Sequence, residues 1–132
     1  MRITIDTSTV LAVVLNEPEK AQLIEITQDA DLVAPMSLHW EIGNAFSLMF
    51  KKRRITFKEA ITAIKLYQEI PIEIININME NSLEISHDYN IYAYDAYMLE
   101  CATESKSSLL TLDHHLIEIA NKMKIKILGG IL

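Results

Sequence analysis

Short runs of β-branched and aliphatic residues alternate along this chain with longer segments in which apolar residues recur at helical spacing. Five runs predict short strands, at residues 2–6, 32–34, 72–77, 109–112 and 124–128. Because helical segments separate the strands, we expect right-handed crossovers and strands that run mostly parallel. The sequence therefore predicts an α/β fold, with a mostly parallel sheet flanked by α-helices on both faces.

Polar residues that favour helix ends mark the beginnings of the expected helices. Thr56 and Glu59 form a capping-box pattern, and Asn90 is a plausible stop for the helix before it. The expected N-cap residues are Ser8, Asn16, Ser37, Thr56 and Asn78.

The length of 132 residues is typical of one domain, so we expect a single domain over residues 1–132. Cys101 is the single cysteine, which excludes an internal disulfide, favours a reducing compartment and predicts a thiol in the core. No apolar run approaches the roughly 18 residues of a membrane span. We therefore expect a cytoplasmic protein with no membrane association.

Four acidic residues stand out by their positions. Asp6 and Asp113 directly follow expected strands, and ligands of parallel sheets bind beyond the carboxyl ends of the strands. Glu41 and Asp95 lie within the apolar stripes of two expected helices. Each has an ordinary alternative: a turn-forming residue for Asp6, a helix N-cap for Asp113, and a solvated position beside the stripe for Glu41 and Asp95.

The four acids together indicate a metal site. Their mutual repulsion makes such a cluster unstable without a divalent cation, and no Lys or Arg lies within one helical turn of Glu41 or Asp95 on the same faces. Carboxylate oxygens are the ligands that Mg²⁺ and Mn²⁺ prefer. One or two such ions can activate water for hydrolysis of a phosphodiester.

At these acids the sequence resembles the PIN-domain family, in particular its small VapC-like ribonuclease toxins. Four short segments carry the resemblance, in the order and spacing of the family across nearly the whole chain. They are Ile5-Asp6-Thr7-Ser8, Glu41-Ile42-Gly43-Asn44-Ala45, Tyr94-Asp95-Ala96-Tyr97 and Leu110-Thr111-Leu112-Asp113.

The resemblance implies a Rossmann-like parallel sheet and an endoribonuclease that depends on Mg²⁺ or Mn²⁺. It also implies the toxin of a toxin–antitoxin pair, a homodimer that an antitoxin peptide inhibits. The implied catalytic and metal-binding quartet is Asp6, Glu41, Asp95 and Asp113, and the implied assisting hydroxyl is that of Thr7, Ser8 or Thr111. Where the family often has basic residues after the fourth acid, this chain has His114 and His115.

Lys51, Lys52, Arg53 and Arg54 form the dense basic run of the chain. One interpretation is a solvated helix end whose cations compensate the helix dipole. The other is an edge that contacts RNA phosphates.

Aromatic residues flank two of the four acids. Trp40 is expected at an interface and Phe46 in the core of the same helix. Tyr92, Tyr94 and Tyr97 surround Asp95, where they either pack within the protein or stack on bases.

The net charge of −6 comes from 18 acidic and 12 basic residues. This excess of acid disfavours RNA, because phosphate binding is driven by Lys and Arg. Four of the acids belong to the predicted metal site, however, and a bound divalent ion would reverse part of their effect on a phosphate. We expect modest, metal-dependent affinity for RNA.

Two alternative functions belong to other classes. A PIN-like fold without catalysis would act as a protein-binding module, holding a partner helix in apolar grooves among the early helices. A receiver-like signalling domain also gathers acids around Mg²⁺, but it needs paired acids after the first strand. Here the first strand supplies one acid, Asp6, and the run 72–77 leads into asparagine.

Overall fold

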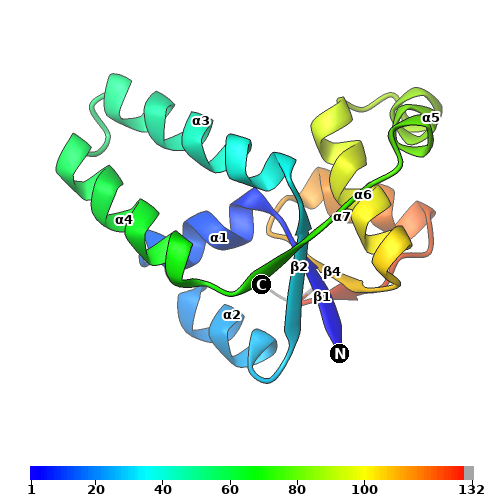
Figure 1. Ribbon diagram of the computed structural model, residues 1–132, viewed down its shortest axis with the longest axis horizontal. Coiled ribbons are helices and arrows are strands. Elements are labelled where there is room, and N and C mark those ends of the chain that lie inside the picture. Colours follow the sequence, from blue (N-terminus) through cyan, green and yellow to red (C-terminus); the bar gives the residue numbers. More distant parts are fainter. Residues whose placement is uncertain (130–132) are drawn as a thin grey trace.

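The strand that ends at Asp6 lies at the centre of a five-stranded parallel sheet in the computed structural model, which describes residues 1–129. Every neighbouring pair of strands is parallel, in the order β3-β2-β1-β4-β5 (Figure 1). The strands are β1 (Arg2–Ile5), β2 (Asp31–Pro35), β3 (Ile72–Ile75), β4 (Ser108–Leu110) and β5 (Ile127–Leu128). The predicted α/β class and parallel sheet are confirmed.

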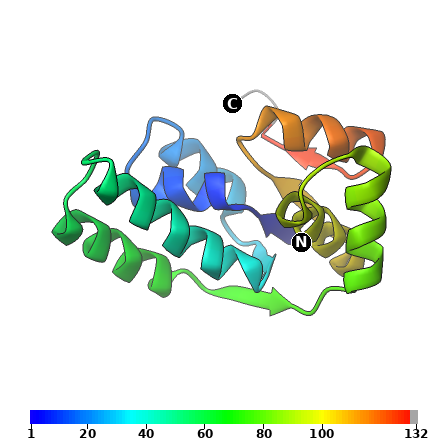
Figure 2. The same cartoon turned by 90° about the horizontal axis from the view of Figure 1, so that it is seen from above.

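Helices cover both faces of this sheet. They are α1 (Thr7–Val14), α2 (Lys20–Thr27), α3 (Ser37–Lys51), α4 (Phe57–Glu69), α5 (Met79–Tyr89), α6 (Ala93–Ser105) and α7 (His114–Lys122). Helices α1 to α4 lie on one side of the sheet and α5 to α7 on the other (Figures 1 and 2). Within residues 1–129, none of the helices combines the length and the apolar character that crossing a membrane requires.

The order of the strands creates a switch point beside β1. The chain builds outward from β1 to β2 and β3, then returns through α5 and α6 to place β4 on the other side of β1. Helices that leave β1 and β4 therefore depart to opposite faces, which opens a crevice beyond the carboxyl ends of these two strands. Ligands of open parallel sheets bind at such a point.

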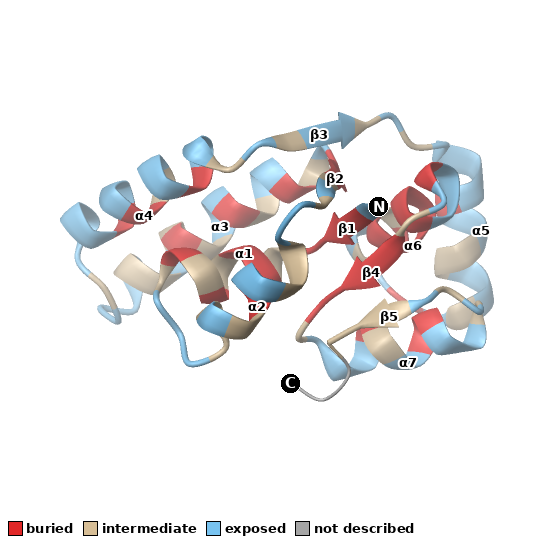
Figure 3. Ribbon diagram, turned by 90° about the horizontal axis from the view of Figure 1, so that it is seen from below, coloured by how far each residue is buried: buried red, intermediate tan, exposed pale blue. Residues whose placement is uncertain are grey.

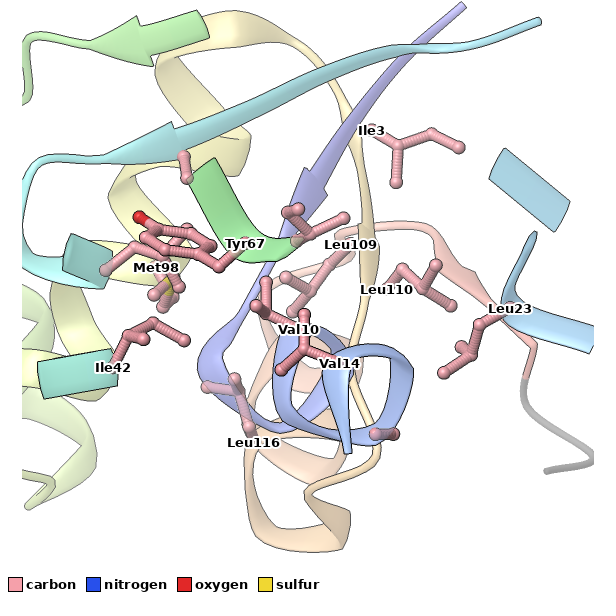
Figure 4. Close-up of a cluster of buried hydrophobic side chains, with 14 of the residues drawn as sticks. Ile3, Val10, Val14, Leu23, Ile42, Tyr67, Met98, Leu109, Leu110 and Leu116 are labelled. Atoms are coloured by element: carbon pink, nitrogen blue, oxygen red, sulfur yellow. The ribbon is translucent and has the colours of Figure 1, made fainter. Parts of the chain in front are cut away.

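Buried aliphatic side chains hold the central strands rigid. Ile3 and Leu109 are fully buried, and Figure 3 shows β1 and β4 buried while the edge strand β3 is largely exposed. Figure 4 draws part of this cluster, to which β4, α1, α3 and α6 contribute side chains. Cys101 is a buried free thiol, as predicted, and burial raises its pKa to about 11.

Several predicted helix ends are confirmed. Thr56 and Glu59 form both hydrogen bonds of a capping box at α4. Asn78 caps α5 through its side chain, and Asn90 ends that helix in the left-handed conformation, with φ of 52°. These ends depend on hydrogen bonds between near neighbours, so the local sequence was sufficient to predict them.

Three predicted caps are wrong. Asp6, not Ser8, caps α1, and its side chain accepts a hydrogen bond from the backbone N–H of Thr9. Ser37 is the first residue of α3, which has no side-chain cap. Asn16 adopts φ of 58° in a turn, and α2 begins only at Lys20. The first error arises because the serine hydroxyl donates to Asp6 instead.

Candidate functional site

One cavity of about 530 Å³ is lined by all four of the acids that the sequence predicts as a site. Asp6 follows β1, Asp113 follows β4, Glu41 lies in the first half of α3, and Asp95 lies in the first turn of α6. The cavity therefore sits at the switch point between β1 and β4. Four segments that are far apart in the sequence supply its acids.

Hydroxyl groups surround the Asp6 carboxylate, which is 5% exposed. The pairing of Ile5 with Leu110 in the sheet brings Asp6 next to Thr111, whose hydroxyl donates to Asp6 Oδ2. On the other oxygen, Ser8 Oγ donates to Oδ1 over 2.7 Å, and the Thr9 backbone N–H donates to it over 3.0 Å. These bonds fix the carboxylate at the floor of the cavity.

Glu41 is also held by a hydroxyl group. The Thr7 hydroxyl donates to Glu41 Oε2 over 2.6 Å, which ties the first turn of α1 to α3. The two hydroxyls of Ser8 and Thr111 contact Asp6, so each of the three hydroxyls predicted to assist contacts one of the predicted acids.

Asp113 has a structural task of its own. Its side chain caps α7 by accepting hydrogen bonds from the backbone N–H groups of His115 and Leu116, over 2.9 and 3.3 Å. The alternative interpretation of Asp113 as a helix N-cap is confirmed. A carboxylate has further lone pairs, so Asp113 can cap the helix and still coordinate a cation at the cavity.

Burial and mutual repulsion raise the pKa values of three of the acids. Burial raises the pKa of Asp6, although its hydrogen bonds act in the opposite direction. Burial raises the pKa of Glu41, and the charges of Asp6 and Asp95 add to it. Burial raises the pKa of Asp95, and the charges of Asp113 and Asp6 raise it further. The charge of His115 acts in the opposite direction. Such shifts in a cleft are typical of functional carboxylates.

Basic side chains do not balance these charges at the cavity. No Lys or Arg is among the residues of the described chain that line it. Arg2, the basic residue nearest to Asp6 in the sequence, instead approaches Glu73 of β3, with 3.6 Å between Nη2 and Oε2. The cavity therefore gathers carboxylates without a protein cation.

The chemistry of these donors fits a hard divalent cation, because all four are carboxylates. Within residues 1–129, no three His, Cys, Asp or Glu side chains are placed so that they could together hold a metal ion. A closed protein cage is therefore not formed. Mg²⁺ ordinarily keeps several waters and uses one or two carboxylates, which an open set of acids can supply.

The basic run lies apart from the acids. Lys51 ends α3, and Lys52 to Arg54 follow it, all exposed. Lys51 comes ten residues after Glu41 in one helix, which places it about 15 Å further along the axis. None of these four residues lines the cavity.

Thr9 and Asn44 were missing from the predicted site residues, whereas Trp40 was expected at an interface and Tyr94 in packing or base stacking. Thr9 is buried, and its Oγ lies 3.1 Å from Asp6 Oδ1 and 2.9 Å from the carbonyl oxygen of Leu110. Asn44, Trp40 and Tyr94 line the cavity. Asn44 lies three residues after Glu41, so helical spacing alone could have placed it on the same face. Phe46 is buried, as predicted, while Trp40 is 63% exposed.

Comparison with solved structures places the fold among known proteins. PAE2754 from Pyrobaculum aerophilum matches with a TM-score of 0.71 at 18% identity, over 90% of this chain and 87% of that one. VapBC2 from Rickettsia felis, bound to a DNA fragment from its promoter, matches with a TM-score of 0.68 at 14% identity, over 92% of this chain and 95% of that one.

A third structure is VapC20 from Mycobacterium tuberculosis, described as a toxin that cleaves the sarcin–ricin loop. It matches with a TM-score of 0.62 at 12% identity, over 88% of this chain and 93% of that one. The search of curated proteins found no significant match. The family model for the PIN domain matches residues 3–122, nearly the whole described chain. The chain therefore belongs to the PIN domain family.

Proposed function

We propose that this protein is an endoribonuclease that depends on Mg²⁺ or Mn²⁺. One observation carries the proposal: four carboxylates from four separate segments line a single cavity at the switch point of the sheet, and no Lys or Arg among residues 1–129 lines it with them. Retaining such a set costs stability, because charges of one sign repel in a partly buried site. Membership of the PIN domain family supports a nuclease in particular.

Each acid has a stated task in this proposal. Asp6, Glu41, Asp95 and Asp113 would bind the ion, some directly and the others through its waters. When bound, the ion would lower the pKa of water and offset the charge of a phosphodiester. The hydroxyls of Ser8 and Thr111 orient Asp6, and the hydroxyl of Thr7 orients Glu41. The basic run from Lys51 to Arg54 would contact RNA phosphates further along the strand.

Cleavage of single-stranded RNA by the purified protein tests this function. We expect activity in Mg²⁺ or Mn²⁺, loss of activity in EDTA, and recovery when the metal is restored. Asp6→Asn and Asp95→Asn should each lose most of the activity. Asp31→Asn is the matched control, because Asp31 is exposed at the opposite, amino end of β2.

Circular dichroism of each variant separates lost chemistry from lost folding. Full activity of folded Asp6→Asn, or full activity in EDTA, would overturn the proposed chemistry. Absence of cleavage by the wild-type protein with metal present would instead favour the catalytically silent protein-binding module.

We further propose that the protein acts in the cytoplasm as the toxin of a toxin–antitoxin pair. The likeness in fold to VapC20, which is described as a toxin, and to VapBC2 supports this role. A small apolar pocket of about 140 Å³ lies among α1, α2 and the end of α4, with Val13, Leu23 and Ile24 in its lining. This pocket could bind an apolar side chain of the partner. A neighbouring reading frame whose product inhibits cleavage is the expected finding.

A homodimer is part of the same proposal. Large apolar side chains are exposed on α3 and α4, among them Leu48, Ile61 and Leu66. Burial of such side chains between two copies would contribute to association. Sedimentation equilibrium of the purified protein should give twice the mass of the chain, and a single-chain mass at all concentrations would contradict the dimer.

A further inference from the structure

A second hollow, of about 430 Å³, adjoins the acidic cavity. It lies beyond the carboxyl ends of β2 and β3, with Pro35 and Ile75 in its lining, whereas the acids lie beyond β1 and β4. Trp40 and Tyr94 line both spaces and so form the boundary between them. With strands about 5 Å apart, the hollow is displaced from Asp6 by roughly 5–10 Å along the same edge of the sheet.

The two boundary residues are exposed aromatic side chains held at fixed angles. Trp40 is 63% exposed and Tyr94 is 55% exposed. The rings of His39 and Trp40 pack in a T-shaped arrangement, with centroids 4.9 Å apart and planes at 80°. The rings of Tyr94 and Tyr97 pack in the same way, with centroids 5.9 Å apart and planes at 86°. Trp40 and Tyr94 thus each have an aromatic neighbour that restrains the ring, and both line the hollow.

The polar groups of the hollow are uncharged. Its lining within the described chain includes Ser37 and Asn76 but no Lys, Arg, Asp, Glu or His. Ser37 Oγ is buried and has no hydrogen-bond partner among residues 1–129. Because this oxygen is buried, a ligand in the hollow would meet the exposed Asn76 rather than the Ser37 hydroxyl.

These properties favour a nucleobase over a phosphate. A phosphate would meet no cation in the hollow and would lie beside four carboxylates. A base is uncharged and planar, it stacks on aromatic rings, and its edge carries the donors and acceptors that an asparagine recognises.

We propose that this hollow binds an unpaired base of the RNA whose phosphodiester occupies the acidic cavity. The inference rests on the proposed ribonuclease function and assigns the residues that hold a base beside the cleaved bond. A base in a duplex is stacked on both faces, so it cannot enter a hollow walled by Trp40 and Tyr94.

Trp40 is the single tryptophan of the chain, so its fluorescence reports directly on the hollow. The test uses full-length Asp6→Asn with Mg²⁺, which allows binding while cleavage is blocked, and a hexamer of riboadenosine as probe. We expect the hexamer to quench Trp40 emission in a saturable way. A hexamer of abasic ribose phosphate, which keeps the phosphates but lacks bases, should leave the emission unchanged.

Steady-state cleavage by otherwise wild-type protein gives a second readout. Trp40→Leu should raise KM about 5- to 100-fold with little change in kcat, because the lost stacking stabilises substrate and transition state alike. Trp40→Phe should recover most of the loss. Phe57→Leu is the matched control, since Phe57 is 65% exposed but lies on α4, outside both spaces.

The outcomes separate this inference from the function on which it rests. Cleavage without quenching, or equal quenching by the abasic strand, overturns the base site and leaves the nuclease intact. Quenching by the hexamer without cleavage supports the base site and removes the catalytic proposal. Absence of both overturns both.

Trp40 was also expected at an interface, and the same fluorescence decides between the two roles. Emission that changes on dilution and not with RNA, together with a Trp40→Leu variant that is monomeric, would assign this surface to a second copy of the chain. That result would also overturn the base site.

Discussion

Thr7 Oγ lies 2.6 Å from Glu41 Oε2, and this hydrogen bond links the first turn of α1 to α3 at the edge of the acidic cavity. Burial raises the pKa of Glu41, and the bond from Thr7 acts in the opposite direction. A single hydroxyl thus sets both the orientation and the ionisation of one acid.

Replacing Thr7 should therefore change the pH dependence of cleavage. In Thr7→Val the pKa of Glu41 rises further, so the acidic limb of the pH–rate profile should move to higher pH and activity near neutral pH should fall. Thr7→Ser keeps the hydroxyl and should keep the wild-type profile. An unchanged acidic limb in Thr7→Val would show that Glu41 ionisation does not control the reaction.

Glu41→Gln should make the metal-free protein more stable while it abolishes cleavage. The pKa of Glu41 is higher in the folded than in the unfolded state, so the wild-type protein loses stability as pH rises from about 4.5 through the folded pKa. Gln keeps an acceptor for Thr7 without the charge. With allowance for screening at a half-exposed group, the gain at pH 7 should be about 0.5–1 kcal/mol.

Urea denaturation in EDTA at pH 7 and pH 4 measures this difference, which should shrink at the lower pH. Glu25→Gln is the control, because Glu25 is exposed on α2 and distant from the cavity. A variant less stable than wild type at pH 7 would mean that the Glu41 carboxylate contributes favourable contacts.

Mg²⁺ should stabilise the wild-type protein, because an ion that binds only the folded state shifts the unfolding equilibrium. At a concentration of 100 times Kd the increase should be about 2.7 kcal/mol. Thermal unfolding with Mg²⁺ and then with EDTA measures it, and Asp6→Asn should show a much smaller shift. Equal shifts in the two proteins would place the ion elsewhere.

Thr9→Val should destabilise the fold by about 0.5–1.5 kcal/mol, because it removes the hydrogen bond that the buried Thr9 hydroxyl donates. The hydroxyl lies between Asp6 Oδ1 and the carbonyl oxygen of Leu110, and thus ties α1 to β4. Thr9→Ser, which keeps the hydroxyl, should recover much of that loss. Chemical denaturation of the two variants provides the comparison, and equal stabilities would assign the effect to packing alone.

Lys51→Ala combined with Lys52→Ala should weaken RNA binding without changing kcat at saturating RNA. For single-stranded RNA, each phosphate contact that is lost should reduce the slope of log K against log salt concentration by about 0.7 in magnitude. Binding to Asp6→Asn in Mg²⁺ over a range of salt measures the slope. An unchanged slope would show that these residues do not contact RNA phosphates and instead form a solvated helix end.

Local sequence was sufficient for the order of strands and helices and for some of the helix ends. The strands predicted at 72–77 and 124–128 are shorter in the structure, at Ile72–Ile75 and Ile127–Leu128. The alternation of strand and helix signals predicted the parallel sheet, and the capping box of Thr56 and Glu59 depends on two residues three positions apart. The cap of α1 was predicted wrongly, because the Ser8 hydroxyl has a choice between the helix backbone and the carboxylate of Asp6. Competition of this kind is decided by the surrounding structure.

The sequence by itself singled out the candidate site residues: Asp6 and Asp113 after strands, and Glu41 and Asp95 within apolar helical stripes. Only the tertiary structure decided that these acids share a cavity, because β4 returns to lie against β1 and brings Thr111 next to Asp6. The parallel pairing of β3, β2, β1 and β4 places their carboxyl ends along one edge, where Trp40 and Tyr94 separate an acidic space from an uncharged one. Hydrophobic periodicity encodes which face of an element is buried, whereas proximity between distant segments arises only from the order of strands in the sheet.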